Sequence, residues 1–275
     1  MTSIYLDMKE KLEQLVCQIA DDEIVHRFAS GNFGKHIKLD GSVLTEVDRK
    51  VQDRIEKELQ TLWPHIAFLG EEMSAEQQQQ KMENSAVWCL DPLDGTSNFA
   101  SGIPFFGVSL ALIENRQSQI GLVYDPIRKE CFTAVNGEGC WLNGTRLSDI
   151  KKDESSPELK EMIAVVDLKR LLKPASRKLL SSICDKHPYR SQRNFGSCAI
   201  EWCWLAAGRF QIYIHGGQKL WDYAAGILIL REAGGSSSTI EGEAIHPWKL
   251  EPQSVVAGCD EASYQTWYQW ISDNK

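Results

Sequence analysis

Two carboxylates follow a strongly apolar segment in the first half of the chain. Residues 86–90 are predicted to form a buried strand, and Asp91 and Asp94 stand where the next turn begins. The carbonyl group of Leu93 lies between them, and hard cations such as Mg²⁺ prefer carboxylate and carbonyl oxygens. Gly95 allows close approach of the backbone, and the amides after it would open a helical turn that can hold an anion. The pattern predicts a cation site beside a phosphate cradle, whereas an Asp-Gly turn by itself would predict only solvated aspartates.

Other acids stand at the ends or on the faces of predicted elements. Thr45 and Asp48 lie three residues apart on one face of a predicted helix. Glu71 follows a short predicted strand at 66–69, and Asp222 begins a later helix. Alone, Thr45 and Asp48 would be an ordinary pair on a helix, and Asp222 would be a carboxylate that the helix dipole favours.

Together these segments resemble motifs of the inositol monophosphatase superfamily, which also contains bisphosphate nucleotidases and fructose-bisphosphatases. The matching segments are residues 45–48, 70–72, 91–99, 221–226 and 232–235. They occur in the family's order, and the resemblance extends over nearly the whole chain. It implies an α+β fold, a layered αβαβα sandwich of the inositol monophosphatase and fructose-bisphosphatase type.

The resemblance also implies a cluster of two to three Mg²⁺ ions. The implied metal ligands are Glu71, Asp91, Leu93 through its carbonyl, Asp94 and Asp222. Two cations about 3.5–4 Å apart can clamp the attacking and leaving oxygens of an in-line displacement. So many acids in one place would repel one another, which makes cations close to a requirement.

The family's catalytic and substrate residues carry over position by position. Glu71 and Thr96 would hold the attacking water, and Asp48 would orient the Thr96 hydroxyl. The implied substrate-binding residues are Asp94, Gly95, Thr96, Gly196, Ser197, Cys198, His215 and Asp222. Ser197 begins a predicted helix at 197–207, so its hydroxyl could equally cap that helix.

One position departs from the family's pattern. His215 stands where members that hydrolyse inositol phosphates have a glutamate that binds substrate hydroxyls, and Gln211 also replaces a common acid. A histidine can exchange hydrogen bonds, attract a second anionic group when protonated, or be purely structural. The substitution puts myo-inositol phosphate itself in doubt and leaves hydrolysis untouched. Lys169 and Arg170 form either a surface pair or a contact to a second phosphate or a neighbouring subunit.

The elements that must position these residues follow from periodicity. Apolar spacing predicts a helix over 4–29 and another after 40–42, and residues 77–80 are predicted to be a solvated connector. Strands predicted at 86–90, 107–113, 120–124 and 131–135 would form an antiparallel meander. A charged stretch at 149–160 separates two halves, 1–150 and 151–275, of one compact unit. The second half alternates strands at 162–166, 210–214 and 254–257 with helices at 175–186, 197–207, 220–233 and 261–271.

Composition excludes several classes of protein. Among 275 residues no apolar run approaches the roughly 20 residues of a membrane span, and charges interrupt the N-terminal apolar pattern. Eight cysteines without a CxxC pair predict free thiols and a cytoplasmic location. A net charge of −8 makes a nucleic acid an unlikely substrate.

The sequence therefore predicts Mg²⁺-dependent hydrolysis of a small phosphate monoester, either inositol monophosphate or a related polyol or sugar phosphate. The alternatives are the same phosphate hydrolysis with a different substrate, which would be a 3′(2′),5′-bisphosphate nucleotide, NADP or fructose 1,6-bisphosphate. A further alternative is a regulatory binding protein with an RNA-related partner. The resemblance also implies a homodimer and inhibition by lithium.

Overall fold

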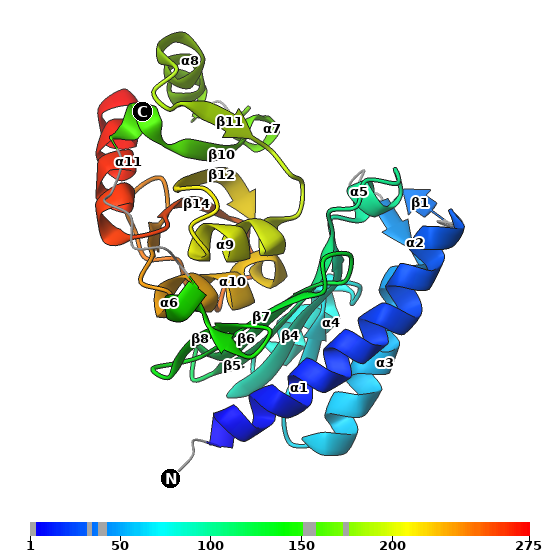
Figure 1. The fold of residues 1–275 in the computed structure, drawn as a ribbon. Helices are drawn as coiled ribbons and strands as arrows, with labels where there is room; N and C mark the ends of the chain where they lie inside the picture. Colours follow the sequence, from blue (N-terminus) through cyan, green and yellow to red (C-terminus); the bar gives the residue numbers. More distant parts are fainter. Residues whose placement is uncertain (1–3, 32–34, 38–42, 151–157, 173–175) are drawn as a thin grey trace.

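The computed structural model describes residues 4–31, 35–37, 43–150, 158–172 and 176–275, and the side chains of residues 35–37, 43 and 44 are not described. Helices and sheets alternate in five layers: a helical pair, a seven-stranded sheet, a second helical pair, a five-stranded sheet and outer helices (Figure 1). Three hydrophobic clusters fill the spaces between successive layers. The predicted αβαβα sandwich is confirmed.

The seven-stranded sheet is an antiparallel meander with one parallel strand at its edge. Its order is β3 (Ala67–Gly70), β4 (Ala86–Asp94), β5 (Gly107–Glu114), β6 (Gln117–Asp125), β7 (Glu130–Val135), β8 (Gly139–Leu142) and β9 (Thr145–Arg146). β3 is parallel to β4, and every later pair is antiparallel. Because helices cover both faces, β4 and β5 are buried along nearly their whole length. The predicted meander is confirmed.

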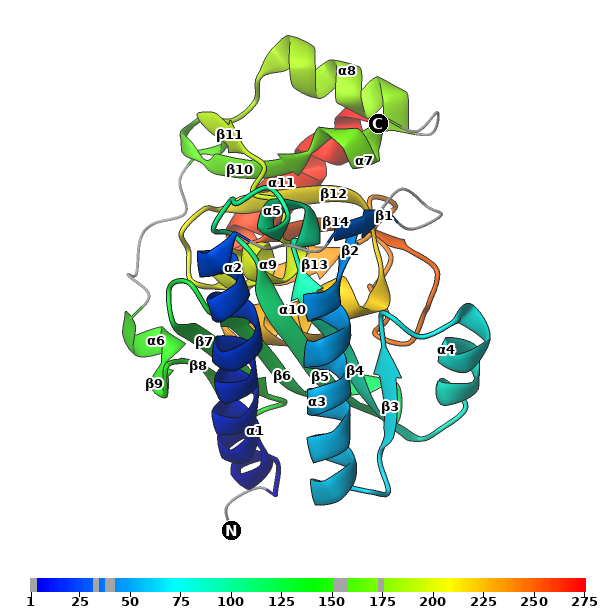
Figure 2. The same ribbon diagram turned by 90° about the vertical axis from the view of Figure 1, so that its right-hand side faces the viewer.

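Two long helices cover the outer face of this sheet (Figure 2). α1 (Ile4–Ala20) continues through a π-helical turn (Asp21–Val25) into α2 (His26–Ser30), which ends at Gly31 in the left-handed conformation. A short hairpin, β1 (Lys35–Ile37) with β2 (Val43–Thr45), leads into α3 (Glu46–Leu62). Both predicted helices are present.

The five-stranded sheet is mixed. Its order is β11 (Ser191–Arg193), β10 (Ile163–Asp167), β12 (Ile212–Gln218), β14 (Gln253–Gly258) and β13 (Ser236–Ser238). β10 is parallel to β11 and β12, whereas β14 is antiparallel to its neighbours. α8 (Arg177–Lys186) and α11 (Glu261–Asn274) pack on its outer face, and α7 (Leu168–Leu171) follows β10 directly.

The middle layer consists of α9 (Cys198–Ala206) and α10 (Leu220–Glu232), which lie between the two sheets. Both helices are apolar on nearly every side, as expected of helices buried on all faces. Close approach depends on Gly226, where an added Cβ would lie 2.4 Å from the Cβ of Trp202. These two helices begin at Cys198 and Leu220, close to predicted site residues.

One prediction about a connector was wrong. Residues 75–81 form a helix, α4 (Ala75–Lys81), rather than a solvated connector. Ser74 and Gln77 make reciprocal capping bonds at its start, the arrangement known as a capping box. Gln78 is buried, and its amide donates to the carbonyl groups of Gly70 and Glu71 at 3.2 and 3.1 Å. A polar run was mistaken for a connector because the carbonyls that Gln78 satisfies come from a turn that sequence alone does not place.

The remaining short elements are α5 (Thr96–Phe99), α6 (Leu147–Ile150) and a 3₁₀ turn at Leu159–Glu161. Residues 151–157 of the predicted charged boundary lie outside the described residues. All eight cysteines carry free thiols, as predicted. Within the described part of the chain, no helix combines the length and the apolar character that crossing a membrane would need.

The Gly226 contact gives a stability prediction. Gly226→Ala is expected to lower the free energy of unfolding by about 1–3 kcal/mol, because the new methyl group overpacks against Trp202. In an open helix the same change would instead stabilise by about 1 kcal/mol. Urea unfolding of the two proteins measures the difference. A variant as stable as the wild type would show that α9 can move away from α10 at little cost.

Candidate active site

Three aspartates from two distant segments meet at one point. Asp91 and Asp94 lie at the end of β4, and Asp222 lies in the first turn of α10. One carboxylate oxygen of each lies within 4.8 Å of the others. The pairing of β4 with β5 is irregular between Asp91 and Asp94, and the backbone amide of Leu93 donates to Asp91 Oδ1 at 3.0 Å. Both carboxylates therefore lie beside Asp222 of α10 at an irregular end of β4.

The cluster is electrostatically unfavourable by itself. Burial raises the pKa of Asp91 and of Asp222 well above the usual range, and the charge of Glu71 raises both further. Burial also raises the pKa of Asp94, which hydrogen bonds partly offset, to about 6. Hard oxygen donors that repel one another are the set that a divalent cation stabilises. The described residues therefore fit the metal that the sequence predicts.

Asp94 connects the cluster to the start of α9. Its Oδ2 accepts hydrogen bonds from the Ser197 hydroxyl at 2.6 Å and from the Ala199 amide at 2.7 Å. Ser197 makes no capping hydrogen bond to its own helix and is fully buried, so the capping alternative is wrong. Gly196 precedes it with a φ of 80°, a conformation that favours glycine.

Thr45, Asp48 and Thr96 lie together at the other side of the cluster. The amide and the hydroxyl of Thr45 donate to Asp48 Oδ2 at 2.7 and 2.5 Å. The Thr96 hydroxyl lies 3.3 Å from Asp48 Oδ1 and 2.8 Å from the Leu93 carbonyl oxygen. Burial raises the pKa of Asp48 to about 7, although the bonds from Thr45 lower it and the charges of Glu72 and Glu71 add to it.

A cavity of about 330 Å³ opens beside the cluster, and Glu71, Arg49, Lys219 and Trp221 are among its lining residues. Glu71 follows β3, where its amide donates to the Leu90 carbonyl at 3.1 Å. Lys219 lies over the Trp221 ring, with Nζ 5.2 Å from the ring centre. The indole Nε1 of Trp221 is buried and has no acceptor among the described residues. An acceptor from a water or a ligand would satisfy it.

Two glutamines that the sequence did not single out hold the turn at Glu71. Gln52 accepts from the Glu72 amide at 3.2 Å, and Gln78 donates to the Glu71 carbonyl. Gly70 is required for this arrangement, because a Cβ there would lie 2.1 Å from Gln52 Oε1. Gln52 lies on α3 and Gln78 lies in the glutamine run of α4, and no local pattern marks either as a support of the site.

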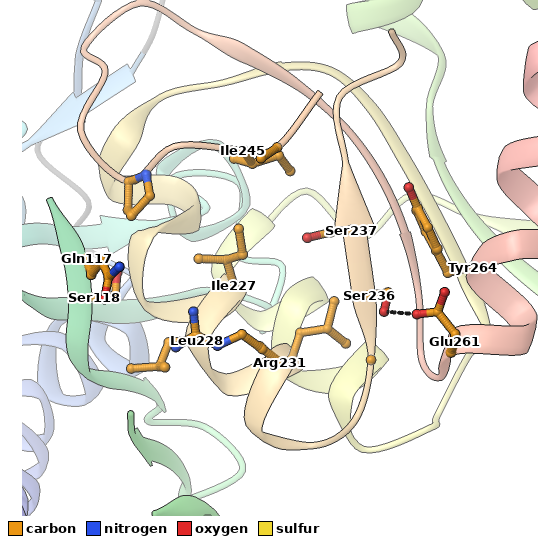
Figure 3. A pocket seen from close by; sticks show the side chains of 14 residues that line it. Gln117, Ser118, Ile227, Leu228, Arg231, Ser236, Ser237, Ile245, Glu261 and Tyr264 are labelled. Carbon is orange, nitrogen blue, oxygen red and sulfur yellow. Dashed lines mark hydrogen bonds between the residues drawn. The ribbon is translucent and has the colours of Figure 1, made fainter. Parts of the chain in front are cut away.

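A second cavity, of about 370 Å³, lies away from the cluster (Figure 3). Side chains of β6, α10, β13 and α11 line it, among them Ile227, Arg231 and Tyr264. Ser236 donates a hydrogen bond to Glu261 there, and Arg231 donates to Asn136 at 3.0 Å. None of the predicted site residues lines this cavity, so it is separate from the aspartate cluster.

Comparisons with known proteins agree with this geometry. A sequence model described as the inositol monophosphatase family matches residues 8–272. The chain belongs to the inositol monophosphatase family. It is 36% identical over 207 residues to inositol monophosphatase 1 of Solanum lycopersicum, covering 73% of this chain and 74% of that one. It is 35% identical over 199 residues to Nus factor SuhB of Pasteurella multocida, covering 72% of each.

A solved structure supports the same assignment. The extragenic suppressor protein suhB of Bartonella henselae superposes with a TM-score of 0.80 at 27% identity, covering 96% of this chain and 100% of that one. The chain is thus a phosphatase of the inositol monophosphatase family, and the aspartate cluster fits the metal dependence of that family.

This inositol monophosphatase family member contains a further buried acid that the sequence did not reveal as a site residue. Glu201 accepts hydrogen bonds from the amides of Phe195 and Gly196 at 2.9 and 3.0 Å and from the Tyr213 hydroxyl at 2.8 Å. Burial raises its pKa to about 7, against the lowering effect of these bonds. It holds the backbone that leads into Ser197. An acid inside an otherwise apolar helix was the available signal.

The structure places His215 near Cys198, with its Nε2 3.8 Å from the sulfur. His215 Nδ1 accepts a hydrogen bond from the Gly217 amide at 3.1 Å, and its Nε2 lies 3.3 Å from Asp167 Oδ2.

The other predicted residues of this region lie in different surroundings. The side-chain oxygen of Gln211 accepts a hydrogen bond from the backbone amide of Ile163 at 2.9 Å. Lys169 and Arg170 belong to α7.

The raised pKa values predict how stability depends on pH. Asp48, Asp94 and Glu201 have pKa values of about 7, 6 and 7, against 3.8 to 4.5 for the ordinary groups. At pH values between the ordinary pKa values of these groups and their raised pKa values in the folded protein, the folded protein binds more protons than the unfolded chain. The free energy of unfolding therefore falls as the pH rises through this range. In the presence of a chelator, the free energy of unfolding should fall from about pH 5 to pH 8.

Urea unfolding at several pH values measures this trend. Addition of Mg²⁺ should reduce the fall, because a cation that binds the folded state favours the ionised carboxylates. Stability that rises steadily over this range without metal would contradict the assignment of these acids as unfavourably buried.

Proposed function

We propose that this phosphatase hydrolyses a small phosphate monoester, inositol monophosphate or a related polyol or sugar phosphate, with the help of Mg²⁺. One observation carries the proposal: Asp91 and Asp94 meet Asp222, more than a hundred residues away in the chain, within 4.8 Å. Such a concentration of buried carboxylates serves cation binding and has no other evident benefit to the fold.

The chain's own oxygens would hold two to three Mg²⁺ ions. Asp91, Asp94 and Asp222 form the centre, and Glu71 and the Leu93 carbonyl would complete it. When bound, Mg²⁺ supplies positive charge for the phosphoryl oxygens and makes a water molecule a better nucleophile. The Leu93 carbonyl accepts a hydrogen bond from Thr96, so its use as a ligand would leave the Thr96 proton to Asp48.

The protein groups around the centre would position the water and the ester. Thr96 donates its proton toward Asp48 or Leu93, so the lone pairs of its oxygen can accept a hydrogen bond from the attacking water. Glu71 would hold the same water from the side of β3. The amides at Gly95 and Thr96 would bind the phosphate.

The alcohol part of the ester would lie on the other side of Asp94. The start of α9, with Gly196, Ser197 and Cys198, is the side that we assign to it, together with His215. Because Ser197 donates to Asp94 and is buried, its contribution is to orient Asp94 and the helix start. Backbone amides and the Cys198 side chain are the groups left to face the substrate.

A second role is suggested by one relative. A regulatory binding protein with an RNA-related partner is the further alternative, and the SuhB relative of Pasteurella multocida is named a Nus factor. A homodimer and a cytoplasmic location, the latter consistent with eight free thiols, complete the proposal. Bisphosphate nucleotides, NADP and fructose 1,6-bisphosphate remain alternative substrates that one phosphate-release panel would rank.

Removal of the metal should abolish activity. Phosphate release should stop in excess chelator and return with Mg²⁺, and Asp94→Asn should lower kcat by at least about 10²-fold, the scale of one lost electrostatic contact in a transition state. Asp53→Asn, the same change on the exposed face of α3, is the matched control and should have no effect. Full turnover in chelator, or wild-type rates for Asp94→Asn at saturating Mg²⁺, would contradict the metal mechanism.

The water-positioning group can be tested by a double-mutant cycle. Glu71→Gln and Thr96→Ala should each lower kcat by about 10²-fold or more, with smaller changes in KM, because both act on the attacking water. If they act on the same water, the double variant should lose little more than either single variant. Fully additive losses would show that the two residues act independently.

A further inference from the structure

The ring nitrogens of His215 are both engaged by the protein. Nδ1 accepts a hydrogen bond from the Gly217 amide, so the ring proton must lie on Nε2. That nitrogen lies 3.3 Å from Asp167 Oδ2 and 3.8 Å from the Cys198 sulfur. The ring is 4% exposed, whereas the Asp167 side chain is 22% exposed. Of this pair, the carboxylate is the more accessible group.

Strand register places Asp167 beside His215. β10 and β12 are parallel, and Asp167 pairs with His215 as Val165 pairs with Tyr213. Paired residues in neighbouring strands point to the same face of a sheet, and residues two apart share that face. Val165 and Tyr213 belong to the hydrophobic cluster around α9 and α10. Asp167 therefore points toward the layer that carries Cys198 and Asp222.

Local contacts fix the position of Asp167. Its Oδ1 accepts from the Arg170 amide at 3.0 Å and so caps α7. Gly216 lets α7 pack directly against β12, because a Cβ there would lie 2.0 Å from the Arg170 carbonyl oxygen. Partial burial raises the pKa of Asp167, but hydrogen bonds from His215 and the Arg170 amide outweigh it, and the pKa lies below the usual range. The carboxylate is ionised at neutral pH.

Short contacts lead from this carboxylate to the aspartate cluster. Asp94 accepts a hydrogen bond from Ser197, which precedes Cys198 in the chain. The Cys198 sulfur contacts the His215 ring at Nε2, and the same ring nitrogen contacts Asp167. The two bonds to Asp167 use two of the roughly four acceptor positions of a carboxylate. Because the Asp167 side chain is 22% exposed, its other acceptor positions can be reached from outside the protein.

From this arrangement we infer that Asp167 is a specificity-determining residue that accepts hydrogen bonds from the hydroxyl groups of a polyol phosphate. This inference rests on the proposed hydrolysis of a phosphate monoester. The acid that the family carries on β12 is replaced here by His215, and β10 supplies a carboxylate at the paired position. His215 acts as a positioning residue, because its Nε2 proton orients Asp167. On this inference, His215 does not exclude inositol phosphate as a substrate.

The test compares a hydroxyl-rich ester, myo-inositol 1-phosphate, with phenyl phosphate, which has no hydroxyl group. Asp167→Asn keeps the cap of α7, since asparagine caps a helix as well as aspartate, so the fold should persist. The variant should lower kcat/KM for the inositol ester about 10- to 100-fold, the scale of a hydrogen bond to a charged group. The loss should appear in KM, with kcat and phenyl phosphate hydrolysis changed by less than about twofold.

Two further variants separate specificity from structure. Asp185→Asn removes an exposed carboxylate from α8 and should behave as the wild type on both esters. Asp167→Asn combined with His215→Glu moves the carboxylate to β12, and it should restore most of the lost preference for the inositol ester. A purely structural role of Asp167 would not be repaired by this relocation.

The outcomes are distinguishable. If the wild type hydrolyses neither ester in Mg²⁺, the proposed function fails and the inference fails with it. If the wild type hydrolyses phenyl phosphate but not the inositol ester, only the inference is overturned. It is also overturned if Asp167→Asn affects both esters equally or neither, or if the relocated carboxylate restores nothing.

Discussion

Mutual repulsion among Asp91, Asp94 and Asp222 is the constraint around which the rest of the structure is arranged. Burial raises the pKa of Asp91 and Asp222, and the charges of the neighbouring acids raise it further, so ionisation of the cluster is disfavoured unless cations bind. A stable scaffold is needed because an unsupported cluster would relax by moving its acids apart. The supports are two: the end of β4, fixed by its neighbours in the sheet, and the first turn of α10, held between both sheets.

Both helices of the middle layer hold residues of the cluster or residues that contact it. α10 carries Asp222 at one end, and α9 presents Ser197 and the Ala199 amide to Asp94. Any displacement between the two helices would therefore change the geometry of the aspartate cluster and of the residues that we assign to substrate binding. The tight contact of Gly226 with Trp202 opposes such displacement, as dense packing generally does. The packing of α9 against α10 thus also sets the positions of the side chains in the proposed site.

The side that we assign to the alcohol part of the substrate depends on strand register instead of helix packing. Asp167 and His215 come together because β10 and β12 are parallel and in register, and Gly216 allows α7 to approach. On our proposal, substrate preference depends on residues of β10 and β12, whereas the proposed metal ligands lie on β4 and α10.

Residue patterns alone predicted the meander, the alternation of strands and helices in the second half and the short motifs of the site, because the strand end and turn at 86–96 are local and specific in composition. The resemblance carried by those motifs then implied the layered fold. The sequence by itself did not determine contacts between distant segments: Thr96 with Asp48, Ser197 with Asp94 across 103 residues, or the glutamines that hold Glu71. It also presented His215 as a missing acid, whereas strand pairing places Asp167 beside it. Residues that are neighbours in the chain reveal a local motif. Which distant side chains come together depends on strand register and helix packing, and these are known only from the three-dimensional structure.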